Sequence, residues 1–392
     1  MISKSYFFVQ KLTFAGVGID PMAKTPNLIV KHPGILYGLT ICSVFHFIIV
    51  SHYAYIHVTD FEEITDSFPM LCQLILCICK VMIFLRKRQQ IFSLIREVHE
   101  RNFKAEGEEL AIVRRENAKD NYLCSVYLRI VIFSGSFAVL HPLANAVYVY
   151  IINGELVLTE PNKATYFWNY SNLAGYSGVY VLNVFTVYFV CVVSLAIDTL
   201  FSWFVSNVMA QFHIIYYRFE RAALTSPETN MTHLQQNNYI ISCIKYHHDI
   251  LKFSEKLKRV YSEIIFIKFT IVCMEICSLV FRVSRPNDSL PDTAYKCLFL
   301  CAVAIQLMVY CYNGQRIKDE SGHVSTAIYC IFDWSNLSKS CKKLLLISMT
   351  RSQKHCNING VFFEVDFSLY LWVFKTAASL LTALKTLEEK QT

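Results

Sequence analysis

Residues 64–88 read ITDSFPMLCQLILCICKVMIFLRKR, a mostly apolar run of 22 residues followed by three consecutive basic residues. About 20 helical residues of this kind cross the hydrocarbon core of a bilayer. Lys and Arg gather at the cytoplasmic ends of such spans. We therefore predict a membrane-spanning helix over 64–85 whose Arg86-Lys87-Arg88 end lies in the cytoplasm.

Six further stretches have the same character, and they lie at 33–58, 122–152, 173–204, 264–281, 294–312 and 361–383. The whole composition agrees, because 54% of the residues are hydrophobic and only 17% are charged, against roughly 25% charged in an average soluble domain. This composition disfavours a disordered chain, a collagen-like repeat and a conventional soluble enzyme. The sequence predicts an all-α membrane protein with seven transmembrane helices.

The orientation follows from the loops between the spans. The N-terminal segment and the loops after spans two, four and six hold 27 Lys and Arg, whereas the loops on the other side and the C-terminal tail hold 5. Because cytoplasmic loops retain basic residues, the N-terminus is predicted to be cytoplasmic and the C-terminus extracellular. A G-protein-coupled receptor has the opposite orientation, so the chain is upside down relative to that class.

Several segments on the predicted cytoplasmic side are amphipathic. After span two they include Ile91 and Val98, and before span five Ile250, Phe253 and Leu257 recur at three and four residues among lysines. This spacing is typical of helices with one buried face. We expect them to form an anchor bundle below the membrane; the alternative is that they lie on the inner leaflet through their basic side chains.

Charged residues inside the spans are expensive in lipid and need partners. Lys268 and Glu275 are seven residues apart on one face of span five, so they are expected to pair directly or through a neighbouring helix. Lys80 is close enough to the inner end of span two to reach water. Asp198 in span four is expected to be a structural hydrogen-bonding group, with a place in an ion path as the alternative.

The sequence contains no pattern that indicates catalysis or metal binding. Most of the 15 cysteines lie in apolar runs, as small buried residues do, and no Walker, GxGxxG or GxSxG motif occurs. We expect no enzyme activity, no cofactor, no metal and no nucleic-acid partner. Two sequons in predicted extracellular loops, at Asn169 and Asn287, are candidate glycosylation sites.

The last eighty residues resemble a known family. The motifs are YCYNGQ at 310–315, DES at 319–321, AIY at 327–329, KKLLL at 342–346 and MTRSQK at 349–354, followed by FSL at 367–369 and FKTAAS at 374–379. Their order and spacing closely resemble the C-terminal signature of insect odorant receptors. The resemblance extends over the whole chain through its length and topology.

This resemblance implies a subunit of a heterotetrameric, odorant-gated, non-selective cation channel of insect olfaction, in the plasma membrane of olfactory sensory neurons, at their dendritic cilia. Such channels combine a variable tuning subunit with a shared co-receptor, Orco, and bind small volatile odorants within the membrane. Residues 205–263 leave no room for the long insertion of the co-receptor, so the chain resembles a tuning subunit. The alternatives are a gustatory receptor-type channel subunit and, less favoured, a metabotropic chemoreceptor of inverted topology.

The family places its ligand pocket in the outer half of spans two, three, four and six. The corresponding candidates are Met70, Leu74, Phe137, His141, Asn145, Tyr176, Tyr180, Phe185, Leu298 and Cys301. His141 and Asn145 carry the most weight, because polar groups at membrane depth are costly without a partner and Pro142 is expected to kink the helix beside them. For each of the aromatic candidates, ordinary core packing is the alternative.

The family's last helix lines the pore and closes it with a hydrophobic constriction. The matching residues here are Ala383 and Leu387 at the constriction, Thr386 between them and Lys375 lower on the helix, with helix packing as the alternative. The resulting division is a cytoplasmic segment 1–32, spans one to four with the pocket at 33–204, a cytoplasmic helical extension at 205–263, spans five and six at 264–312, a cytoplasmic anchor segment at 313–360, and the pore helix with an extracellular tail at 361–392.

Overall fold

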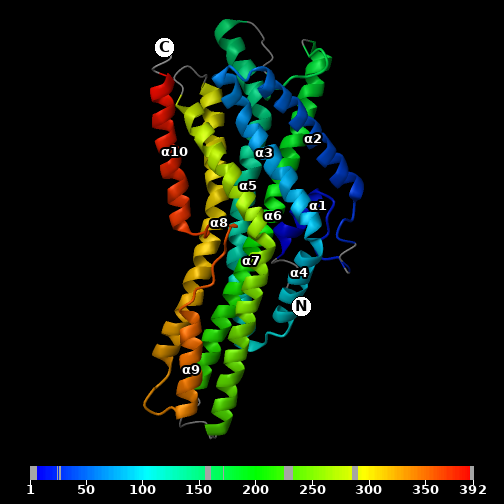
Figure 1. The fold of residues 1–392 in the computed structure, drawn as a ribbon. Helices are drawn as coiled ribbons and strands as arrows, with labels where there is room; N and C mark the ends of the chain where they lie inside the picture. Colours follow the sequence, from blue (N-terminus) through cyan, green and yellow to red (C-terminus); the bar gives the residue numbers. More distant parts are fainter. Residues whose placement is uncertain are drawn as a thin grey trace.

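The computed structural model describes residues 7–23, 25, 28–154, 160–170, 172–224, 233–284 and 290–388, with the backbone alone at 61, 153, 224, 233 and 383–388. Within these residues the chain is helical, and most of the helices run side by side along one long axis (Figure 1). The helices are α1 (Phe8–Gly16), α2 (Pro33–Ile56), α3 (Phe61–Arg86), α4 (Arg88–Phe103), α5 (Gly107–Asn153), α6 (Leu173–Leu224), α7 (His233–Val283), α8 (Leu290–Ile331), α9 (Lys339–Ser352) and α10 (Phe367–Glu388).

Six of these helices, α2, α3 and α5 to α8, are long and apolar enough to cross a membrane. They coincide with the first six predicted spans. Four of them run far beyond a single crossing: α6 has 52 residues, which corresponds to about 78 Å at 1.5 Å per residue, against roughly 30 Å of hydrocarbon.

The seventh apolar helix, α10, begins later than the sequence predicts. Residues 361–366 are apolar enough to resemble the start of a span, but they are not helical. Instead the Val365 amide donates to the Ile358 carbonyl at 2.8 Å, and Asp366 caps the helix by accepting from the Leu369 amide at 3.0 Å. With 22 residues, α10 is about 33 Å long, which still matches one crossing.

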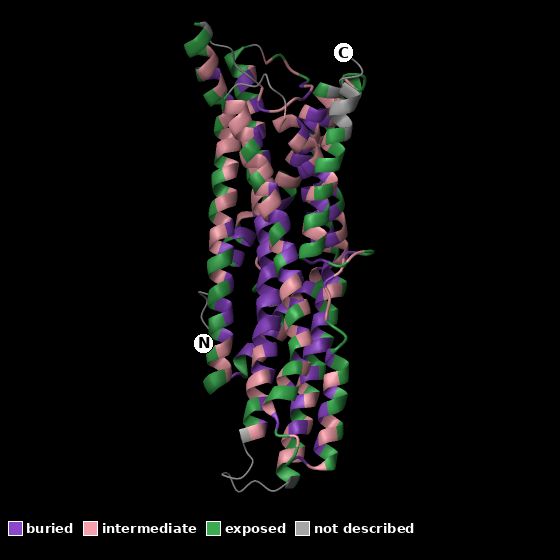
Figure 2. Cartoon of the chain, turned by 90° about the vertical axis from the view of Figure 1, so that its left-hand side faces the viewer, coloured by how far each residue is buried: buried purple, intermediate pink, exposed green. Residues whose placement is uncertain are grey.

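The core of the bundle is centred on α6. Every residue of α6 from Val193 to Phe212 is buried, and a helix that is buried on all faces must be surrounded by other helices. Figure 2 shows buried residues concentrated in the middle and lower part of the molecule, with more intermediate and exposed residues towards the top. The upper part is therefore the less densely filled one.

The amphipathic segments pack against one another at the lower end of the bundle. Ile91 and Val98 of α4 are buried, as are Ile250, Phe253 and Leu257 of α7. Helix α4 contacts α6 and α7, and α9 contacts α7 and α8. The apolar faces that the sequence predicts are thus covered by other helices of the chain.

Helix α10 lies at the edge of the bundle (Figure 1) and packs on α7 and α8. Its inner face includes the buried Val373 and Ala377, while Leu371 and Trp372 on the outer face are more than half exposed. Close approach is needed where the chain enters this helix, because a Cβ at Gly314 of α8 would collide with the carbonyl oxygen of Val365. Glycine at that position lets the start of α10 lie directly against α8.

Candidate ligand-binding site

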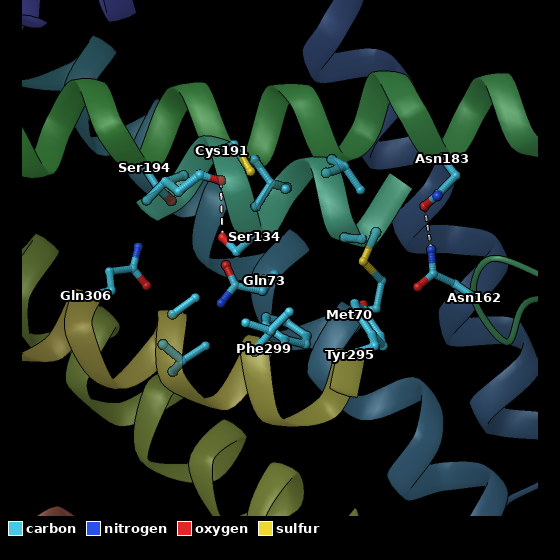
Figure 3. Close-up of a pocket in the computed structure, with 18 of the residues that line it drawn as sticks. Met70, Gln73, Ser134, Asn162, Asn183, Cys191, Ser194, Tyr295, Phe299 and Gln306 are labelled. Carbon is cyan, nitrogen blue, oxygen red and sulfur yellow. Dashed lines mark hydrogen bonds between the residues drawn. The ribbon is translucent and has the colours of Figure 1, made fainter. Parts of the chain in front are cut away.

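A cavity of about 110 Å³ lies between α3, α5, α6 and α8. For comparison, an apolar protein cavity of roughly 150 Å³ holds a benzene molecule. Figure 3 shows its lining, with Gln306 and Ser194 at one end and Asn162 and Asn183 at the other. The lining residues are Met70, Gln73, Tyr127, Val131, Ser134, Gly135, Ala138, Asn162, Asn183, Val187, Val190, Cys191, Ser194, Tyr295, Leu298, Phe299, Ala302, Val303 and Gln306.

The cavity exists because small side chains face it at helical spacing. On α5 the positions 131, 134, 135 and 138 lie on one face, and on α8 positions 295, 298, 299 and 302 do the same. Ser134, Gly135, Ala138 and Ala302 leave space that larger residues would occupy. A Cβ added at Gly135 would lie 2.9 Å from the sulfur of Cys191, so α5 and α6 pack in close contact at this point of the cavity lining.

The Gln306 end of the cavity adjoins a buried ionic network centred on Asp198. The Asp198 carboxylate accepts hydrogen bonds from Lys80 Nζ (2.8 Å), Lys268 Nζ (2.9 Å), Tyr127 OH (3.1 Å), Gln306 Nε2 (3.1 Å) and Tyr310 OH (2.7 Å). These donors come from α3, α7, α5 and α8, so one carboxylate joins five helices. Charges this deep are stable only when paired and hydrogen-bonded, and two of the donors, Tyr127 and Gln306, also line the cavity.

The network changes the partners expected for the charged residues. Lys268 does not pair directly with Glu275, since its ammonium group binds Asp198 and both oxygens of Glu275 accept from Gln73 Nε2, at 2.8 and 3.0 Å. Lys80 does not reach water; its side chain is 1% exposed and it binds Asp198. In both cases a partner on a facing helix is closer than the one that a single helix offers. Asp198 does act as a structural hydrogen-bonding group.

A second, polar hollow of about 420 Å³ adjoins the cavity at its Asn162 end. The two share Met70, Asn162, Tyr295 and Phe299. The polar hollow is lined by the ion pair of Arg282 with Asp66, at 3.0 Å, and by a hydrogen bond between His141 and Asp292, at 2.7 Å. The polar hollow, with its charged lining, therefore lies next to the mostly apolar cavity.

The predicted ligand residues separate into three groups. Met70 and Leu298 line the cavity, and His141 and Asn145 line the polar hollow, where the His141 ring also stacks on Tyr295 with centroids 4.5 Å apart. The others line neither space: Leu74, Phe137, Tyr176, Tyr180, Phe185 and Cys301. Tyr180 instead donates to the Val139 carbonyl at 3.0 Å, which ties α6 to α5.

The direction of each helix face explains these differences. Asn183 and Val187 point into the cavity, so Phe185, two residues along and about 200° around the helix, points away and is half exposed. Gln73, Ser194 and Gln306 were not among the predicted residues. Their signal in the sequence is a polar side chain inside an apolar span, at helical spacing from small residues on the same face.

The predicted pore and glycosylation residues lie at the margins of the described chain. Lys375 is exposed on α10. Ala383, Thr386 and Leu387 belong to the last turns of α10, and their side chains lie outside the described residues. Asn169 is exposed in the segment 160–170, and Asn287 lies outside the described residues.

Two carboxyl groups outside the spans, those of Asp366 and Glu97, have a lowered pKa. Although partial burial opposes ionisation, the hydrogen bond from Lys318 Nζ, 2.9 Å away, and those from the first turn of α10 lower the pKa of Asp366 below its usual value. On α4, burial is likewise outweighed by Lys256 and Arg101, so the pKa of Glu97 is lowered. Both carboxylates are therefore anionic links between helices.

No cluster of three or more His, Cys, Asp or Glu residues suited to a metal ion occurs in the part of the chain that the structure describes. The cavity lining likewise offers amides, hydroxyls and apolar groups in place of metal ligands. Its chemistry is that of a site for a small, mostly apolar molecule with a few polar contacts.

Sequence comparison relates the chain to chemosensory proteins. A family model described as 7tm Odorant receptor matches residues 60–378. The chain is similar to Odorant receptor 45a of Drosophila melanogaster, with 30% identity over 392 residues, covering 98% of this chain and 99% of the relative. It is also similar to Odorant receptor 9a of the same species, with 24% identity over 384 residues, covering 96% and 95%.

Structure comparison gives the same fold. The chain is similar to the insect olfactory receptor OR5 from Machilis hrabei in complex with eugenol, with a TM-score of 0.78 and 12% identity, covering 98% of this chain and 97% of that one. Another structure of the same receptor matches with a TM-score of 0.76 and 11% identity, covering 97% and 96%. At this identity the likeness establishes the fold alone.

Proposed function

The chain belongs to the insect odorant receptor family, and on that premise we propose that it is an odorant-binding tuning subunit of a heterotetrameric, ligand-gated, non-selective cation channel. Its partner subunit is the co-receptor Orco. A small volatile ligand binds in the cavity between α3, α5, α6 and α8 and opens the pore. The chain works in the plasma membrane of olfactory sensory neurons, at their dendritic cilia.

One observation carries this proposal, namely the mostly apolar cavity with amides and hydroxyls at its ends. A volatile ligand offers little more than apolar surface and one or two polar atoms, and such a chamber matches both. Met70, Leu298 and the other lining residues are the proposed contacts. Because the polar hollow adjoins the cavity, His141 and Asn145 are proposed to act on the approach of the ligand.

The position of α10 supports a role in the pore. A helix that lines a channel between subunits must lie at the edge of its own subunit, as α10 does, and its outer face carries exposed apolar residues that a neighbour or lipid can cover. Lys375, Ala383, Thr386 and Leu387 are the proposed pore residues. The packed lower ends of α6 to α9 are proposed to form the cytoplasmic anchor. Asn169 and Asn287 are proposed glycosylation sites.

A route from the cavity to α10 also exists in the packing. Part of the cavity wall lies on α8, and the Asp198 network includes Lys268 of α7. These are the two helices on which α10 packs. A ligand opens a channel only to the extent that it binds the open state better than the closed one. We propose that small shifts of α7 and α8 around the occupied cavity change the position of α10.

The test is whole-cell current in a non-neuronal cell line that expresses this chain alone, Orco alone, or both, with G-protein signalling blocked. Rapid odorant-evoked cation current that requires both subunits is the expected result. A response that disappears under the G-protein block would overturn the channel mechanism. A full response of the chain alone would overturn the tuning-subunit assignment.

A further inference from the structure

At the Gln306 end of the cavity, more hydrogen-bond acceptors than donors face the interior of the cavity. Gln306, Gln73 and Ser194 come from three different helices and converge there (Figure 3). Each already makes a hydrogen bond to a group outside the cavity. What each still offers to a ligand follows from the chemistry of that outer partner.

Gln306 is held in one orientation by the network. Its Nε2 lies 3.1 Å from Asp198 Oδ2, and Asp198, which also binds two lysine ammonium groups, is a carboxylate that accepts hydrogen bonds and donates none. The amide nitrogen must therefore face Asp198. The amide oxygen is left for the cavity, and it accepts no hydrogen bond from the described residues.

Gln73, on a different helix, likewise has its amide nitrogen turned out of the cavity. Its Nε2 lies 2.8 and 3.0 Å from the two oxygens of Glu275, so its Oε1 also remains as an acceptor. In Figure 3 this oxygen points towards Ser134. Two amide oxygens from α3 and α8 thus face the same end of the chamber.

The nearby hydroxyl groups extend the pattern. Tyr127 OH donates to Asp198 at 3.1 Å and Ser134 Oγ donates to the Val131 carbonyl at 3.1 Å, so each presents only oxygen lone pairs. Ser194 Oγ differs, because it accepts from Lys80 Nζ at 3.4 Å and keeps its own proton. Acceptors therefore dominate this end of the cavity, with one hydroxyl donor among them.

We propose that the cavity selects odorants that carry a hydroxyl group, alcohols or phenols, with that group placed between the amide oxygens of Gln306 and Gln73 and the hydroxyl of Ser194. This rests on the proposed function of the cavity as the odorant site. A hydroxyl donates to an amide oxygen and accepts from Ser194 at once. An ether, ester or ketone oxygen only accepts, so it pairs neither amide oxygen, whereas the single proton of an alcohol pairs one of them.

The first test uses matched odorants on the wild-type receptor expressed with Orco. A primary alcohol is compared with the methyl ether and the acetate of the same carbon chain. Since a desolvated, unpaired acceptor weakens binding, the alcohol is expected to be at least tenfold more potent. Equal or greater potency of the ether or the acetate would overturn the proposal.

Substitutions then assign the preference to the two amides. Gln306→Met and Gln73→Met keep the length of the side chain but remove the acceptor, so the alcohol-to-ether potency ratio should fall towards one. The matched control is Leu298→Met in the apolar wall, which is expected to shift both potencies together. A ratio that stays at its wild-type value in both glutamine variants would overturn the proposal. Because Gln306 also supports Asp198 and Gln73 also supports Glu275, the readout in both variants is the alcohol-to-ether ratio and not the potency of either ligand alone.

A binding measurement separates this inference from the proposed function. The melting temperature of the purified chain in detergent is measured with the same odorant pairs. Stabilisation by the alcohol above the ether, without any Orco-dependent current, would support hydroxyl selection and overturn the channel function. Current that is evoked only by carbonyl or hydrocarbon odorants would support the channel and overturn hydroxyl selection.

Discussion

At the scale of single residues, Asp198 carries a full charge at a position with no access to solvent. Among the described residues, its charge is compensated by Lys80 and Lys268, on two other helices, and by three neutral donors. The Lys268 ammonium also lies 4.0 Å from the centre of the Tyr310 ring, which adds a cation–π contact. The network therefore has one more positive than negative charge among its three ions.

Removing the single negative charge should be severe. Asp198→Asn leaves two buried lysines without a counter-ion, so we expect a loss of about 3–5 kcal/mol of stability, seen as a lower melting temperature in detergent and little protein at the cell surface. The control is Asp319→Asn, the same chemical change at an exposed position of α8, which should be nearly neutral. Wild-type surface level and melting temperature in Asp198→Asn would contradict the role given to the network.

Gly135 lies in the cavity lining, where α5 packs closely on α6. Gly135→Ala places a methyl group 2.9 Å from Cys191 Sγ, and overpacking of this kind costs about 1–3 kcal/mol. We expect roughly a tenfold loss of potency for the longest active odorants of a homologous series and a smaller loss for the shortest, in dose–response curves with Orco. Gly38→Ala is the control, because a Cβ there meets nothing within 4 Å; equal losses for all chain lengths would argue against a steric effect.

At the scale of whole elements, the sequence predicts the positions of the helices well, but it predicts less well which face of each helix lines the cavity. Apolar length alone identifies α2, α3 and α5 to α8, because a bilayer imposes a minimum length on each span. The start of α10 is different: Val361, Phe362 and Phe363 are apolar but form a short non-helical segment, and the cap at Asp366 depends on Lys318, 48 residues earlier. A contact between residues so far apart in the sequence cannot be predicted from the pattern of neighbouring residues.

The same limit applies to the candidate site. Met70 and Leu298 were predictable from the helices that form the pocket, whereas Gln73 and Gln306 depend on how far each helix is rotated about its axis. That rotation is set by the pairing of Gln73 with Glu275 and of Gln306 with Asp198. A single sequence shows that these side chains are polar and inside spans, but it does not show which partner each one meets.

The start of α10 gives an element-scale prediction. Asp366→Ala removes both the acceptor of the Leu369 amide and the partner of Lys318, so it should destabilise the first turn of α10 by about 1–2 kcal/mol. Hydrogen exchange of the backbone amides at 367–371 should become faster. Asp366→Asn keeps the cap oxygen and loses only the charge, so its exchange should lie between wild type and Asp366→Ala. Identical exchange in all three proteins would contradict the cap.

The same carboxylate predicts a dependence on pH. The folded-state pKa of Asp366 is lowered, so its contribution to stability is fully present above the unfolded value, about 3.9, and is lost as the pH falls through the folded value. Between pH 5 and pH 3 the melting temperature of wild type should therefore decrease more than that of Asp366→Asn. A larger decrease in the variant would show that the sign is wrong.

At the scale of the whole molecule, the distribution of basic residues predicts how the bundle lies in the membrane. With 27 Lys and Arg on one side and 5 on the other, an epitope at the C-terminus should be labelled on intact cells, and one at the N-terminus only after permeabilisation. A sequon introduced after Glu388 should be glycosylated if it is far enough from the membrane. N-terminal labelling of intact cells would contradict this orientation.

The buried network also has a consequence for how the protein is made. Lys80 leaves the ribosome 118 residues ahead of Asp198, and Asp198 leaves it 70 residues ahead of Lys268. A lone charge at the centre of a spanning helix costs about 2.5–3.5 kcal/mol to insert. Each early segment therefore enters the bilayer with an unpaired charge, which is neutralised only when its partner on a later helix is inserted. Biogenesis of the bundle is therefore ordered in time: α3 has to be retained near the insertion machinery until α6 arrives, and both must wait for α7 before the charges are enclosed.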